Sequence, residues 1–150
     1  MKRAGVIAIL ALSFLGLADS AYIAQHETSG APLICDINNL SGCNIVVASP
    51  YSYLFGVPIA EYGIIFYSIL FVLAALELVV FDQLLRRALQ GISLIGVIAS
   101  LYFTLIQVFV INALCIYCLA SAFIALVILI CASFIEPLSR SAQSSPPLIV

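Results

Sequence analysis

Four of the five cysteines form two pairs whose spacing suits thiol–disulfide chemistry. Cys35 and Cys43 lie in one polar connection, and Cys115 and Cys118 form a CxxC motif. Residues i and i+3 share a helix face, so the two sulfurs of a helical CxxC lie near enough for a disulfide with modest adjustment. A thiolate attacks a disulfide through a mixed disulfide, so two pairs that meet could pass electrons from one to the other.

Other interpretations of the cysteines remain open. A lone cysteine in a membrane span is usually a small apolar residue, and we interpret Cys131 in this way because it lies deep in an apolar run. Cys35 and Cys43 could form a purely structural disulfide. A zinc site built from the four paired cysteines is disfavoured because half of its ligands would lie in hydrocarbon, so we expect no metal.

The composition excludes a soluble domain. Hydrophobic residues make up 65% of the chain and charged residues only 8%, which leaves too little polar surface to cover a soluble core. The net charge is −2, and no basic patch suggests nucleic acid. We therefore expect an integral membrane protein.

Four apolar segments predict an all-α membrane four-helix bundle, with spans at about 5–24, 59–81, 91–111 and 113–135. Residues 91–135 contain no charge, and one helix of that length would be more than twice as long as the roughly 30 Å hydrocarbon core is thick. Asn112 is expected to break this run as the N-cap of the last span. Cys115 would then lie in the first helical turn, where the helix dipole favours a thiolate.

The domain prediction follows from these spans. Residues 1–136 are expected to form one membrane domain, and residues 137–150 a flexible cytoplasmic tail. The first apolar segment also resembles a signal peptide with a loose cleavage site at residues 18–20, an alternative that would leave three spans.

The basic residues predict the orientation. All five lie in the N-terminal stub, the second connection or the tail: Lys2, Arg3, Arg86, Arg87 and Arg140. The positive-inside rule assigns these segments to the cytoplasm. We therefore expect a multi-pass protein of the cell membrane, with residues 25–58 as an outward-facing loop that caps the bundle and carries active-site cysteines at the extracytoplasmic face.

Three polar residues follow one face of the third predicted span. Ser100, Thr104 and Gln107 are spaced i, i+4 and i+7, and could supply the few polar groups of an apolar pocket for a lipid-soluble acceptor. Interhelical hydrogen bonding without any ligand is the interpretation that we favour for them.

Several motifs together resemble the vitamin K epoxide reductase family, in particular its prokaryotic thiol:quinone oxidoreductases. Residues 43–49 (CNIVVAS) look like the family's C-x-x-V-x-x-S, and residues 55–60 (FGVPIA) look like its FG-x-P-x-A. Residues 114–121 (LCIYCLAS) look like its fourth-helix CxxC. The order and spacing of these motifs are far more specific than the CxxC alone.

This resemblance implies a quinone of the ubiquinone, menaquinone or vitamin K type, held beside the CxxC under the loop cap. It further implies that Cys35 exchanges with a thioredoxin-like partner and that Cys43 passes electrons to Cys115. Cys118 would face the quinone, and Ser49 matches a serine that the family uses near the ring.

The predicted function is that of a membrane thiol:quinone oxidoreductase that supports disulfide bond formation. We expect a separate thioredoxin-like disulfide carrier, because the tail ends without the fused thioredoxin-like domain that many homologues carry. The alternative is a non-enzymatic structural or assembly subunit of a membrane complex with a stabilising disulfide, whose CxxC would be inert to a quinone.

Overall fold

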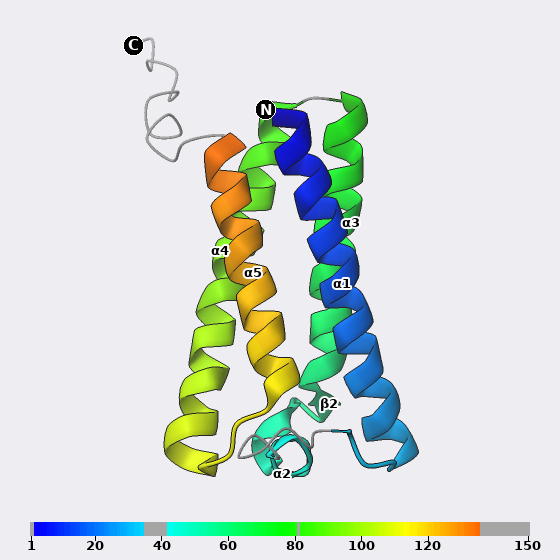
Figure 1. Cartoon of the computed structure of the whole chain (residues 1–150), viewed down its shortest axis with the longest axis vertical. Coiled ribbons are helices and arrows are strands. Elements are labelled where there is room, and N and C mark those ends of the chain that lie inside the picture. Colours follow the sequence, from blue (N-terminus) through cyan, green and yellow to red (C-terminus); the bar gives the residue numbers. More distant parts are fainter. Residues whose placement is uncertain (1, 35–41, 81, 136–150) are drawn as a thin grey trace, which may run out of the picture.

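Four long apolar helices form the body of the protein (Figure 1), which confirms the predicted all-α membrane bundle. The computed structural model describes residues 2–34, 42–80 and 82–135. The elements are α1 (Lys2–Ser29), α2 (Cys43–Val47), η2 (Pro50–Ser52), β1 (Tyr53–Leu54), β2 (Val57–Pro58), α3 (Ile59–Val80), α4 (Gln83–Ile106), η3 (Gln107–Ile111) and α5 (Ile116–Ile135). The predicted tail at 137–150 lies outside the described residues.

The bundle has the basic residues of α4 at one end and the CxxC at the other. The start of α1, the end of α3, the start of α4 and the end of α5 lie at one end, shown at the top of Figure 1. The short elements α2 and β2 and the connection between η3 and α5 lie at the other end. Arg86 and Arg87, in the first turns of α4, are therefore separated from the CxxC by the length of the bundle.

Two helices extend beyond the predicted spans. Helix α1 continues to Ser29 rather than residue 24, and α4 begins at Gln83 rather than residue 91. Asp82 explains the second difference, because its side chain accepts a hydrogen bond from the backbone N–H of Leu84 at 3.1 Å and so caps the helix. Hydropathy marks only the part of a helix that suits hydrocarbon, and a cap can start the helix earlier.

The prediction that Asn112 is an N-cap is wrong. Asn112 has φ 54° and ψ 33°, a left-handed conformation, and it ends the π-helical segment η3. The N–H of Ala113 donates to the carbonyl of Gln107 at 3.1 Å and closes that end. Helix α5 begins only at Ile116, so Cys115 immediately precedes it. Asparagine suits helix starts and left-handed helix ends alike, and the residue type alone did not distinguish them.

The core joins all four long helices through close contacts. Tyr67 of α3 is 1% exposed, and its ring packs directly against Gly16 of α1, where any larger residue would collide with it. The Tyr67 hydroxyl donates to the carbonyl of Ser121 in α5 at 2.8 Å. At the far end, Arg86 Nε lies 2.6 Å from the buried carboxylate of Glu77, which ties α4 to α3.

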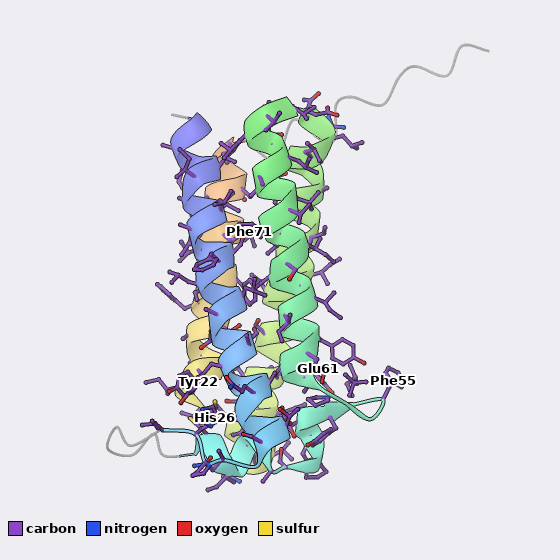
Figure 2. All side chains as sticks on the ribbon, turned by 90° about the vertical axis from the view of Figure 1, so that its right-hand side faces the viewer. Tyr22, His26, Phe55, Glu61 and Phe71 are labelled. Atoms are coloured by element: carbon purple, nitrogen blue, oxygen red, sulfur yellow. The ribbon has the colours of Figure 1, made fainter. Side chains whose placement is uncertain are left out.

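A compact cap closes the end that carries the CxxC. The Asn44 side chain bonds the backbone of Leu33 twice, accepting from its N–H at 2.8 Å and donating to its carbonyl at 3.3 Å. Strands β1 and β2 pair through a two-residue turn at Phe55 and Gly56, both with positive φ, as a type I′ turn requires. Phe55 is 94% exposed and points away from the bundle (Figure 2). The two bonds between Asn44 and Leu33 thus anchor the cap next to Cys43.

Candidate functional site

Cys43 and the CxxC meet where the cap touches the bundle. Cys43 begins α2 and Cys115 immediately precedes α5, and both are fully buried in one cluster with Leu33 and Val46. Cys43 is disulfide-bonded, whereas Cys115 is free. Cys35, the other loop cysteine of the sequence, lies outside the described residues. The fold therefore brings a disulfide sulfur and a free thiol into one cluster.

Gly42 allows this approach. A Cβ at this position would lie 2.8 Å from the carbonyl oxygen of Leu114 and 2.9 Å from the Cβ of Ala113. Carbon atoms normally stay about 3.5–4.0 Å from a non-bonded neighbour, so only glycine fits without a shift. The residue before Cys43 thus touches the chain that leads into Cys115.

The surroundings of Cys115 favour its thiolate. A hydrogen bond from the Cys118 thiol lowers the pKa of Cys115, burial raises it, and the backbone N–H groups of Cys118 and Tyr117 lower it further, with a net lowering. Both N–H groups belong to the first turn of α5, where they have no partner within the helix. Gln107 accepts a hydrogen bond from the backbone N–H of Cys115 at 3.2 Å and fixes its position.

Cys118 faces a different environment. It lines a cavity of about 270 Å³ between the helices and the cap. Most of the wall is apolar and includes Phe66, Ile95 and Phe103. Cys115 therefore shares the buried cluster of the cap cysteine, whereas Cys118, which packs against the same cluster, also lines the cavity.

The polar residues predicted from the sequence gather on this cavity. Ser49, Ser100, Thr104 and Gln107 all line it. Ser49 donates to the carbonyl of Val46 at 2.7 Å, and Thr104 donates to the carbonyl of Ser100 at 2.7 Å. Gln107 is 4% exposed and holds Cys115 as described above. Their contact with a quinone stays a prediction.

Further polar residues of the wall were not predicted from the sequence. Asp19 and Glu27 of α1 line the cavity, together with Tyr67 of α3 and Ser121 of α5. Asp19 carried a usable signal, because an ionisable residue inside an apolar span commonly marks a functional site. Tyr67 and Ser121 carried none, since the contact between them joins two helices far apart in the sequence.

Aromatic contacts hold the end of α1 over the CxxC. The ring centroid of Tyr22 lies 5.3 Å from that of Tyr117 and 4.4 Å from that of His26. Figure 2 shows Tyr22 and His26 on the last turns of α1, at the end of the bundle that carries the cap. Tyr117 also donates to the carbonyl of Ile34 at 3.0 Å, which fastens the chain leading toward the cap.

Comparison with known proteins agrees with this arrangement. The model of the vitamin K epoxide reductase family matches residues 7–133. The thiol-disulfide oxidoreductase LTO1 of Arabidopsis thaliana is 30% identical over 116 residues, which cover 73% of this chain and 31% of that relative. The chain thus spans about a third of the length of this relative. The family match and the four apolar helices identify a multi-pass membrane protein. The chain belongs to the vitamin K epoxide reductase family.

Proposed function

We propose that the protein is a membrane thiol:quinone oxidoreductase that oxidises a thioredoxin-like partner and so supports disulfide bond formation. The observation that carries this proposal is the division of the CxxC. Cys115 lies in one buried cluster with the disulfide-bonded Cys43, and Cys118 lines the cavity. Such a pair can receive electrons on one side and deliver them on the other.

The cavity suits a quinone. Its volume of about 270 Å³ is close to the lower end of the roughly 300–1,000 Å³ common for small-molecule sites, and its wall is apolar with a few polar groups. When bound there, a quinone would supply an acceptor for two electrons and two protons. Ser49, Ser100, Thr104 and Gln107 are the proposed polar contacts, and Cys118 is the proposed sulfur beside the ring.

The electron path starts at the cap. The partner's dithiol reduces a disulfide between Cys35 and Cys43 and leaves as a disulfide. Cys43 then attacks Cys115 in the oxidised CxxC, forming a mixed disulfide and releasing the Cys118 thiolate. Cys35 attacks Cys43 in turn, which restores the loop disulfide and leaves Cys115 and Cys118 reduced. The proposed order is supported by the described residues, in which Cys43 is disulfide-bonded while Cys115 and Cys118 are free thiols.

Quinone reduction by the purified protein tests the proposal. Two donors are compared, a reduced thioredoxin-like protein and dithiothreitol, which is small enough to reach the CxxC through the cavity that Cys118 lines. Cys35→Ala and Cys43→Ala should lose activity with the protein donor and keep part of it with dithiothreitol. Cys131→Ser is the matched control and should behave like the wild type. Loop variants that remain fully active toward the protein donor would reduce the loop pair to a structural disulfide.

The proposed location of the cysteines is the extracytoplasmic face. The support is that Arg86 and Arg87 lie at the opposite end of the bundle from Cys115. The test introduces a single cysteine at residue 36 or residue 88 of a cysteine-free variant. In intact cells, a membrane-impermeant thiol reagent should label the cysteine at residue 36 and leave the cysteine at residue 88 unlabelled. Labelling only at residue 88 would reverse the orientation.

A further inference from the structure

Two carboxyl groups of α1 line the cavity without a role in the electron path. Asp19 and Glu27 are eight residues apart, or about 12 Å along the helix axis at roughly 1.5 Å per residue. Each has a buried carboxyl oxygen that lacks a hydrogen-bond partner within the described part of the chain, Oδ2 of Asp19 and Oε1 of Glu27. Buried polar atoms are usually satisfied, so orphaned oxygens on a cavity wall indicate groups available to a ligand or a proton.

Asp19 lies in a place that disfavours a bare negative charge. It faces an apolar cavity within the membrane span, and Arg86 and Arg87 lie at the far end of the bundle. A carboxyl group in such a position costs much less when it carries its proton than when it is ionised. Asp19 and Cys118 line the same cavity, so that proton is available to a molecule bound there.

The reaction needs such a proton. When Cys115 is a thiolate, the reduced CxxC holds two transferable electrons but only one proton, on the Cys118 thiol. Conversion of a quinone to a quinol takes up two electrons and two protons. The second proton must therefore come from a group other than the two cysteines.

We propose that Asp19 is the second proton donor of the quinone site and that Glu27 returns the proton to it from the outer end of α1. The inference rests on the proposed function. In the balanced step, Cys115 thiolate, Cys118 thiol and protonated Asp19 become the Cys115–Cys118 disulfide and the Asp19 carboxylate. Two electrons and two protons enter the cavity, and the net charge of the three side chains stays at one negative charge.

Electrostatic contacts support the coupling of Asp19 to the cysteines. Asp19 interacts with both Cys115 and Cys118, and its negative charge raises the pKa of Cys115. A thiolate at Cys115 is therefore favoured while Asp19 holds its proton. Glu27 lies nearer the cap, close to Tyr53 of β1. Cys43 and Cys35 each lose a thiol proton when they attack in the electron path. One of these protons can convert the released Cys118 thiolate to a thiol, and the other can return through Glu27 to Asp19, which closes the cycle.

The decisive variant is Asp19→Asn, which keeps the size and polarity of the side chain but has no acidic proton. Reduced protein is mixed with ubiquinone-1, and quinol formation is followed in a single turnover. We expect a roughly 100-fold slower reaction, within the range for loss of a general acid. The quinone concentration that gives half of the maximal single-turnover rate should change less than threefold. The rate of electron transfer from the loop cysteines to the CxxC should also change less than threefold. Asp19→Glu should restore most of the rate. Asp82→Asn, which removes an exposed carboxyl at the opposite end of the bundle and keeps a side chain that can cap α4, should have no effect.

A second readout does not depend on turnover. The infrared spectrum of the reduced wild type should contain the carbonyl stretch of a protonated carboxyl group, absent from Asp19→Asn and displaced in frequency in Asp19→Glu. A wild-type rate in Asp19→Asn, or a spectrum without an Asp19-dependent band, would overturn the inference and leave the proposed function standing. A wild-type protein that exchanges thiols but reduces no quinone would overturn the proposed function itself, and the inference with it.

Discussion

Replacement of Gly42 by alanine should weaken the contact through which electrons enter the CxxC. The added methyl group would meet the carbonyl oxygen of Leu114 at 2.8 Å and its nitrogen at 2.9 Å. Both are backbone atoms and cannot rotate away, so α2 and Cys43 must move away from the chain that leads into Cys115. Overpacking of this kind costs about 1–3 kcal/mol.

That cost sets the expected loss of rate. If the close approach of Cys43 to Cys115 is needed only for exchange between them, about 1–3 kcal/mol corresponds to a roughly 5- to 150-fold slower transfer. Turnover is measured with a reduced thioredoxin-like donor and, separately, with dithiothreitol. The protein donor should show the full loss of rate, whereas dithiothreitol should show a smaller one because it can reduce the CxxC through the cavity without Cys43.

Gly91→Ala is the matched control, because nothing lies within 4 Å of a Cβ at that position in α4. It should leave both activities unchanged and, as a glycine-to-alanine change inside a helix, stabilise the protein by about 0.5–1 kcal/mol. Equal rates for Gly42→Ala and the wild type with the protein donor would refute the reasoning, since exchange between Cys43 and Cys115 would then not depend on this close packing.

Three further predictions concern separate parts of the molecule. Cys118→Ala and Cys118→Ser should abolish quinone reduction with any donor, while Cys131→Ser should not, as measured by quinol formation. In a Cys131→Ser background, Cys118→Ala should raise the pKa of Cys115, because the hydrogen bond from the Cys118 thiol that lowers this pKa is lost. Cys118→Ser keeps a hydrogen-bond donor and should raise the pKa less, with the Cys115 thiolate followed by its ultraviolet absorbance. Glu77→Ala should lower stability by about 3–5 kcal/mol because it breaks the ion pair between the buried Glu77 carboxylate and Arg86, and quinone reduction should match the wild type after correction for folded protein, as measured by thermal unfolding and turnover.

The sequence predicted the bundle because hydropathy acts on whole segments. A run without charges that is too long for one span must turn, and the turn indeed falls near Asn112. The spacing of Ser100, Thr104 and Gln107 likewise predicted a shared face, and all three line one cavity. The length of an apolar segment and the spacing of residues along a helix are local properties, so they can be predicted without knowledge of the contacts between helices.

Features that depend on contacts between helices were not predictable in the same way. The left-handed end at Asn112 moved the helix start to Ile116 and placed Cys115 before the first turn. The proposed role of the Asp19 carboxyl depends on the packing of α1 and α5, which places Asp19 and Cys118 on the wall of one cavity. Neither outcome follows from a residue type or a spacing along one helix.

The central claim is that electrons leave the CxxC for a quinone in the cavity, and one anaerobic single turnover tests it most directly. Fully reduced Cys35→Ala/Cys43→Ala protein, in which the CxxC is the only cysteine pair left, is mixed with one equivalent of ubiquinone-1. Quinol is measured by absorbance and the new disulfide is mapped by mass spectrometry. We expect one quinol for each Cys115–Cys118 disulfide. Quinone that stays oxidised while both thiols stay free would contradict it.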